Sequence, residues 1–330
     1  MAQTSQVDEV RRQGKGAVVG AFWQEIRSLR RQGWGNPLGY LFVGPGVLLY
    51  FVFAAYPIIR GLIMAFQDYR FLIPASRNPL VSFNGLDNWI ELAQDQLWWH
   101  SFKVALVFTL GTFPANLVLG LTAAVLISAL PNRFWQVFTR VVVYLPVIVP
   151  ISVAMLMWGA VYDPDVGYLS YFVTRVIPLT NSPPRWLGFG WALPSMMVAV
   201  VWTQFGYNAI LFLVGIYGIN RELYEAASID GANALNRFRH VTLPALKPTF
   251  TLIFVLSAGI VSATVPMMIL TGGGPAQETL TAGLYLYRQA FSTEYSDMRM
   301  GYAATMNLVL GLIHIILAGI VFKTMGTERN

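Results

Sequence analysis

The stretch "YEAASIDGANALNRFRHVTLP", residues 224 to 244, interrupts a chain that is 55% hydrophobic. It holds small residues and scattered charges, and it lies between two long apolar segments. A structureless connection of this length is unusual, so we expect the stretch to fold locally. Its role depends on the kind of protein that surrounds it.

The composition indicates an integral membrane protein. The 330 residues have a positive mean hydropathy and only 12% charged side chains, which is too apolar for one soluble core. A helix needs roughly 20 residues to cross the hydrocarbon layer, and six apolar stretches reach that length. They are residues 38–66, 103–130, 137–162, 192–219, 249–270 and 302–323. Because unpaired backbone groups are costly in lipid, we predict an all-α, polytopic membrane protein with six transmembrane helices. We expect the prolines inside these stretches to kink the helices rather than end them.

Several kinds of site are not indicated. The chain has no cysteine, and its three histidines lie far apart, so neither a catalytic thiol nor a metal site is predicted. The net charge of +6 comes mostly from residues that flank apolar stretches, which favours a role in membrane topology over nucleic-acid binding. Gly14-Lys15 and Gly272–Pro275 both lack the pattern of a phosphate-binding loop. We therefore expect no catalytic residue and no cofactor bound by this chain.

The basic residues predict the orientation. With a cytoplasmic N-terminus, fourteen Lys and Arg lie on the inner side and seven on the outer side, with Arg60 inside the first span. This bias places both termini and residues 220–248 in the cytoplasm. The predicted parts are an N-terminal tail (1–37), a six-helix domain (38–323) and a C-terminal tail (324–330). Within the first tail, Val18 to Arg31 has the pattern of a helix on the membrane surface, and a disordered basic tail is the alternative.

The opening stretch has the signals of two short helices. Asn220 is suited to cap the first, whose first turn carries Glu222. Gly231 is suited to turn the chain, and Pro244 to open the next span. Leu223, Ala226, Ala227 and Asp230 share one face by helical spacing. Small side chains on that face allow close approach of another surface, although a solvated face is the common alternative.

The order of residues in this stretch is specific. Glu225-Ala226-Ala227 is followed after three residues by Gly231, after nine more by Val241, and then by Leu243-Pro244. This pattern resembles the EAA loop of ATP-binding-cassette (ABC) importer permeases, through which such subunits contact their ATPase. Val241 replaces the usual isoleucine. The resemblance implies a coupling role for Glu225, Ala226, Ala227, Gly231, Leu243 and Pro244.

Further stretches are similar to the carbohydrate branch of that family, the type related to the first maltose permease. They include "AYPIIRGLIMAFQDY" in the first span, "FNGLDNWIEL" after it, "LPVIVPISVAMLMWGAVYDPDVGYL" in the third, and "LTGGGPAQETLTAGLYLYRQAF" after the fifth. Residues 263–266 depart from the family pattern, which leaves local substrate contacts open.

The resemblance implies a type I ABC importer permease fold with cytoplasmic coupling helices, in the bacterial inner membrane. It also implies the partners, which are a second homologous permease, two ATPases that hold ATP and Mg, and an extracytoplasmic sugar-binding protein.

An ion-coupled secondary transporter is the alternative function. Such carriers keep ionisable groups in their spans, and here only Arg60 and His314 fall there. Polar side chains do share helical faces, as expected for a solute pathway or for helix packing. Two amides and a phenol on one face of the fourth span exceed what packing needs. We expect the pathway to be lined by Gln204, Tyr207 and Asn208, with Asn307 and Asn116 behind them.

Overall fold

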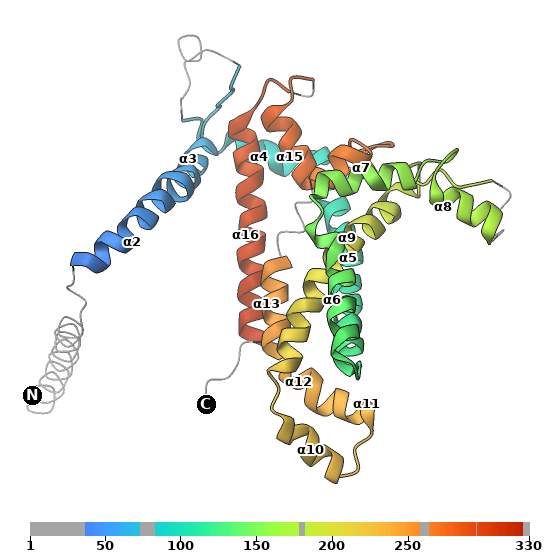
Figure 1. Ribbon diagram of the computed structural model, residues 1–330. Helices are drawn as coiled ribbons and strands as arrows, with labels where there is room; N and C mark the ends of the chain where they lie inside the picture. Colours follow the sequence, from blue (N-terminus) through green and yellow to red (C-terminus); the bar gives the residue numbers. More distant parts are fainter. Residues whose placement is uncertain (1–36, 73–82, 178–181, 258–263, 295, 326–330) are drawn as a thin grey trace, which may run out of the picture. The chain divides into compact units, whose positions relative to one another are not determined.

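The computed structural model describes residues 37–72, 83–177, 182–257, 264–294 and 296–325. Nearly all of the regular secondary structure in these residues is helical (Figure 1). The chain divides into two compact units, Met1–Gly61 and Leu62–Asn330. The surface helix expected within Val18 to Arg31 lies outside the described residues.

The first unit provides the first predicted span. Helix α2 (Pro37–Tyr50) continues through the π-helical turn η1 (Phe51–Ala55) into α3 (Tyr56–Met64). The π-turn directly precedes Pro57, which lacks the N–H that would bond the carbonyl of Phe53 in a regular α-helix. Large apolar side chains such as Phe42 and Phe53 are exposed, as expected of a surface that faces lipid.

The second unit contains the remaining helices, which lie in this order. They are α4 (Asp87–Gln94), α5 (Gln96–Ala129), α6 (Arg133–Ile148), α7 (Ile151–Val161), α8 (Tyr168–Tyr171), η2 (Phe172–Val176), α9 (Ala192–Tyr217), α10 (Arg221–Ile229), α11 (Ala234–Arg237), η3 (Phe238–Thr242), α12 (Leu243–Ala245), α13 (Lys247–Ser257), α14 (Val265–Leu270), α15 (Ala282–Phe291) and α16 (Met300–Met325). In Figure 1, α4 and α15 lie at one end of this unit and α10 and α11 at the other.

The number of possible spans agrees with the sequence. Four helical runs of the described chain are long and apolar enough to cross a membrane: Tyr40–Met64, α5, α9 and α16. Two bent pairs raise the number to six if each counts as one span. All six predicted apolar stretches therefore contain helix, but two of them are not single helices.

The predicted third span, residues 137–162, breaks in the middle. Helix α6 ends at Ile148, and α7 begins at Ile151 with its axis turned by 95°. Pro150 causes the break because proline pushes the residue before it out of the helical region, and Val149 is extended at φ −72°, ψ 124°. The expectation of a kink was wrong here.

The predicted fifth span, residues 249–270, contains two helices of the described chain, and residues 258–263 between them lie outside the described residues. Helix α13 ends at Ser257, and α14 begins at Val265 with Pro266 in its first turn. A proline in a first turn loses no hydrogen bond, so Pro266 starts a helix rather than kinking one. Helix α14 then packs against α7, where Leu270 lies beside Gly159.

Close packing around α9 forms the centre of the second unit. Gly206 lies directly against the backbone carbonyl of Val143 in α6, where a Cβ atom would collide. On another side of α9, a Cβ at Gly120 of α5 would lie 2.8 Å from the Cβ of Asn208. Small residues let helix backbones approach in this way, and van der Waals contact then holds them together in lipid.

A carboxylate joins three helices at the end that carries α4 and α15. Asp95 caps α5 by accepting from the backbone N–H groups of Leu97 and Trp98. Its other oxygen accepts from the hydroxyls of Tyr285 in α15 and Tyr302 in α16, both at 2.7 Å. Asp95 therefore fixes the start of α5 relative to two helices that lie about 190 residues away along the chain.

These bonds set the protonation of Asp95. Burial raises the pKa of its carboxyl, but the hydrogen bonds from Tyr302, Tyr285 and the two backbone N–H groups lower it more, so the net pKa lies below the ordinary value. A lowered pKa in the folded state means that ionised Asp95 contributes stability above the unfolded-state pKa. That contribution is lost as the pH falls through the folded-state pKa.

We predict that Asp95→Asn lowers the free energy of unfolding by about 1–3 kcal/mol at neutral pH, because all four hydrogen bonds lose their charged acceptor and the amide NH₂ cannot accept from the tyrosine hydroxyls. The variant should also lose part of the acid sensitivity below about pH 4. Thermal unfolding of the purified protein in detergent between pH 3 and pH 7 measures both. Asp165→Asn removes the same charge from an exposed position and should leave the curve unchanged. Identical curves for the two variants would contradict the role of Asp95.

Candidate coupling loop and translocation helices

The connection between α9 and α13 is built from short, capped helices. As expected, the side chain of Asn220 caps α10 by accepting from the N–H of Glu222 at 3.1 Å. Asn233 caps α11 in the same way, accepting from the N–H of Asn236 at 2.8 Å. The second cap was missed in the sequence, although an asparagine directly before a helical pattern is a usual start signal. The predicted local folding of the loop is confirmed.

Gly231 makes the turn between the two helices. Its φ of +76° lies in the left-handed region, which glycine adopts without a steric penalty. The turn is closed by the N–H of Ala232, which donates to the carbonyl of Ala227 at 2.9 Å. The described chain leaves open space where a Cβ would lie, so the need for glycine is one of backbone conformation rather than packing.

Pro244 does not open the next span as expected. The chain is helical from Ala234 through η3 to Ala245, and α13 begins only at Lys247 after a bend of 59°. A π-turn comes just before the proline. The N–H of Leu243 donates to the carbonyl of Phe238, five residues back, so the helix has already widened where Pro244, which has no N–H to donate, follows.

The loop has one covered face and one exposed face. Tyr224 lies inward and its hydroxyl shares a hydrogen bond of 2.9 Å with Thr242, while Ala227 is half-buried. On the outer face, Leu223, Ala226 and Asp230 are exposed. The four residues predicted to share one contact face are therefore divided, because the loop itself covers part of Ala227.

The remaining coupling candidates lie at the edges of this module. Glu225 and Pro244 are exposed and Leu243 is half-buried. Two apolar residues that the sequence reasoning missed, Ile229 and Leu235, are 87% and 70% exposed. Exposed apolar side chains beside small ones are typical of a surface that another protein covers.

The pathway candidates of α5 and α9 lie close together. Asn116 is one helical turn before Gly120, and Gly120 packs against Asn208, so both amides lie at the contact of the two helices. Asn208 is 6% exposed and Asn116 1%. Neither amide atom of Asn116 has a hydrogen-bond partner in the described residues. A buried amide without a hydrogen-bond partner costs free energy. A shift of α5 against α9 that gives the Asn116 amide a partner would therefore be favourable.

The other candidates differ in exposure. On α9, Gln204 is half-buried and Tyr207 is 43% exposed. Asn307 is exposed on α16, and no hydrogen bond in the described residues joins it to the amides of α5 and α9. Trp202 of α9 packs edge-on against Trp158 of α7 at 5.8 Å between ring centroids.

Two polar side chains on α5, Thr109 and Thr112, make hydrogen bonds within their own helix. Thr109 and Thr112 donate to carbonyls of their own helix, and Thr112 is fully buried. The packing alternative therefore accounts for these two hydroxyls, whereas it leaves the amide of Asn116 without a partner.

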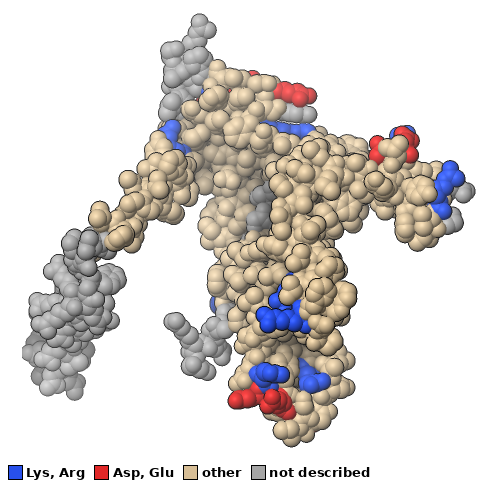
Figure 2. Space-filling view, viewed as in Figure 1, with Lys and Arg blue, Asp and Glu red and all other residues tan. Residues whose placement is uncertain are grey.

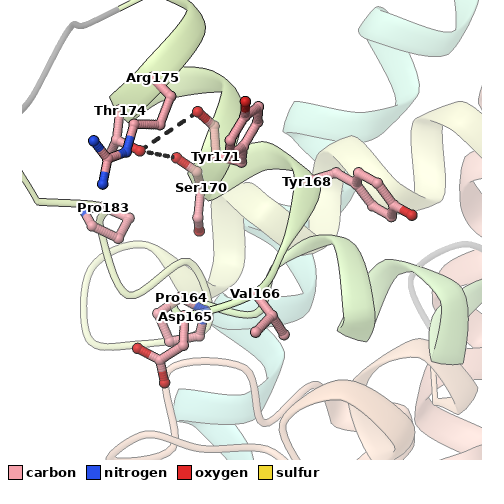
Figure 3. A pocket seen from close by; sticks show the side chains of 9 residues that line it. All are labelled: Pro164, Asp165, Val166, Tyr168, Ser170, Tyr171, Thr174, Arg175 and Pro183. Carbon is pink, nitrogen blue, oxygen red and sulfur yellow. Dashed lines mark hydrogen bonds between the residues drawn. The ribbon is translucent and has the colours of Figure 1, made fainter.

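A separate pocket of about 920 Å³ lies beside α8 and η2, as Figure 3 shows. Asp165 and Arg175 line it from different segments, and the hydroxyl of Thr174 is held at 2.8 Å by the carbonyl of Ser170. Sequence reasoning did not identify this pocket. No group of three or more His, Asp or Glu in the described ranges is placed to hold a metal ion.

Comparison with known proteins identifies the family. Residues 116–325, more than half of the chain, match the model of the binding-protein-dependent transport system inner membrane component. The chain is 30% identical to the probable ABC transporter permease protein YurN of Bacillus subtilis, over 88% of this chain and 97% of that protein. It is 29% identical to the lactose transport system permease protein LacF of Rhizobium radiobacter, over 86% and 92%.

The fold also matches a solved structure. A chain of a bacterial ABC transporter involved in the import of the acidic polysaccharide alginate superposes with a TM-score of 0.75 at 20% sequence identity, over 94% of this chain and 100% of that chain. The six apolar segments, the capped loop between α9 and α13 and the family match agree. This chain belongs to the inner membrane components of binding-protein-dependent transport systems, and is a permease subunit of an ABC transporter.

Proposed function

We propose that this chain is one of two homologous permease subunits of an ATP-driven sugar importer in a bacterial cytoplasmic membrane. Two ATPase subunits would hold ATP and Mg, and an extracytoplasmic binding protein would deliver the sugar. The observation that carries the proposal is the compact loop of α10 to α12, whose outer face presents Leu223, Ala226 and Ile229 to another protein.

The distribution of charge supports the orientation. The inner side in this proposal holds the loop of α10 to α12, both termini and twice as many Lys and Arg as the outer side. Asp95, the Asp165 pocket and α15 then face outward, where the binding protein docks.

The substrate class follows from relatives and from the chemistry of α9. A permease that shares 29% identity over nearly the whole chain serves lactose transport. The amides of Gln204 and Asn208 both donate and accept, as sugar hydroxyls do. Tyr207 adds an aromatic face suited to the apolar side of a sugar ring. Asn116 and Asn307 would contribute as the helices move.

The mechanism uses the loop as a lever. Closure of the ATPases would move α10, and the bond from Tyr224 to Thr242 transmits the movement to the run that leads into α13. Since α9 enters the loop at one end and α13 leaves it at the other, both would tilt. In this mechanism Gly231 sets the turn, and Glu225, Leu243 and Pro244 border the contact with the ATPase.

We predict that sealed vesicles containing the whole transporter take up sugar from the loaded binding protein when ATP is inside and ionophores have collapsed the ion gradients. ATP should drive the uptake because the described spans contain no carboxylate for ion coupling. Radiolabelled sugar measures the uptake. Loss of uptake on collapse of the gradients, with ATP still present, would instead support an ion-coupled carrier.

We predict that Ala226→Trp abolishes ATP-driven uptake and reduces crosslinking of α10 to the ATPase at least tenfold, because an indole cannot enter a contact shaped for a methyl group. Ala160→Trp makes the same change at an exposed position on α7, far from the loop, and should transport normally. Membrane insertion of both variants is checked by immunoblot. Normal uptake by Ala226→Trp would show that the ATPase docks elsewhere.

We predict that Gln204→Ala lowers the uptake rate about two- to tenfold at a saturating concentration of loaded binding protein, because one hydrogen bond to the passing sugar is lost. Thr109→Val is the control, since that hydroxyl bonds its own helix. ATP hydrolysis, measured in parallel, should fall less than uptake. Equal effects of the two substitutions would assign Gln204 to helix packing.

A further inference from the structure

A second pocket, of about 660 Å³, lies between the coupling loop and the ends of two membrane-spanning helices. Ser128 comes from the last turn of α5 and Tyr217 from the end of α9. The opposite wall comes from the loop, through Tyr224 of α10 and Arg237 of α11. The pocket therefore joins the moving loop to the spans.

The polar part of this pocket is cationic. Arg221 and Arg237 line it, and no Asp or Glu is among the described lining residues. The side chain of Arg237 makes one hydrogen bond, to the hydroxyl of Ser228 at 3.2 Å, and the side chain of Arg221 makes no hydrogen bond or ion pair in the described chain. A third arginine stands next to the wall, because Arg140 donates to the hydroxyl of Tyr217 at 2.8 Å. Most of the donors of Arg221 and Arg237 thus remain open for an anion.

The rest of the pocket is apolar. Val125 and Ile216 line it from the spans, and Ile219 and Phe238 line it from the loop side. A free phosphate ion gains nothing from such walls, whereas the glycerol and upper acyl carbons of a lipid do. The position suits a lipid, because the candidate spans α5 and α9 end here, and Figure 2 shows basic side chains beside acidic ones at this end of the molecule.

We propose that this pocket binds the headgroup of an anionic phospholipid, with the phosphate at Arg221 and Arg237 and the upper acyl chain against Val125 and Ile216. This inference rests on the proposed orientation, in which the pocket faces the inner leaflet. The inner leaflet is anionic, and basic pockets between spans on that side suit acidic headgroups. A lipid bound here contacts both the loop of α10 to α12 and the spans α5 and α9, and so stabilises one position of the loop relative to the spans.

The test uses the purified full-length chain in detergent. Native mass spectrometry compares retention of phosphatidylglycerol with that of phosphatidylcholine carrying the same acyl chains. Phosphatidylglycerol should bind more tightly, and Arg221→Gln with Arg237→Gln should weaken it roughly 30-fold, since each arginine contributes about a fivefold factor near an anionic headgroup. The double lysine variant, which keeps both charges, should retain most of the binding.

Matched variants separate the pocket from general charge. Arg239→Gln with Lys247→Gln removes the same charge from two exposed positions of the same connection that do not line the pocket, and binding should be preserved. Ser128→Trp fills the pocket without changing charge and should reduce binding at least tenfold. Equal retention in the two glutamine pairs would overturn the proposal, as would unchanged retention in Ser128→Trp.

Two further outcomes would assign the pocket to another occupant. Displacement of the lipid by millimolar inorganic phosphate would make it a free-anion site. Displacement by the ATPase subunits would make it part of their docking surface, and either result rejects the lipid. Failure of ATP-driven uptake is measured separately and would overturn the proposed function without changing these retention values.

Discussion

The close approach of α9 to its neighbours is the constraint on which the rest of the structure depends. Inside a membrane the lipid is as apolar as the side chains, so helices are held by contact rather than by escape from water. Gly206 against Val143, and Gly120 against Asn208, bring the backbones of α6 and α5 to α9. The same approach places the amide of Asn116 at the α5–α9 contact, and it fixes the end of α9 from which the coupling loop leaves.

The two ends of the second unit are held together differently. At one end, Asp95 gathers α5, α15 and α16 through charge-assisted hydrogen bonds, and Arg299 holds Glu91 of α4 at 2.5–2.6 Å. At the other end, hydrogen bonds between Tyr224 and Thr242 and from Arg237 to Ser228 join α10 to the run that leads into α13. A well-bonded end keeps its shape, while a lightly bonded end can move as a unit. That difference suits the proposed mechanism, in which ATPase movement enters at the loop and a binding protein docks opposite.

The amide of Asn116, which has no hydrogen-bond partner among the described residues, also suits a protein with more than one stable arrangement. A buried amide without a partner costs free energy comparable to a lost hydrogen bond, and a shift of α5 against α9 can recover it. The break of the third expected span at Pro150 makes α7 a separate short helix, and α7 packs with α14 beside α9. The proposed pathway is therefore surrounded by short helices as well as by long membrane-spanning ones.

The sequence by itself determined what depends on local rules. Span length, basic flanks, the cap at Asn220 and the turn at Gly231 all follow from neighbouring residues, and the order of letters in the loop indicated the family. Only the tertiary structure decided what depends on distant segments. It joined Asp95 to Tyr285 and Tyr302, left Ala227 less exposed than Ala226, broke the third span, and made Arg221 and Arg237 line an amphiphilic pocket. The physical reason is that the helical period predicts the helix face on which a side chain lies. It does not predict which other helix packs against that face, because this depends on residues far away in the sequence.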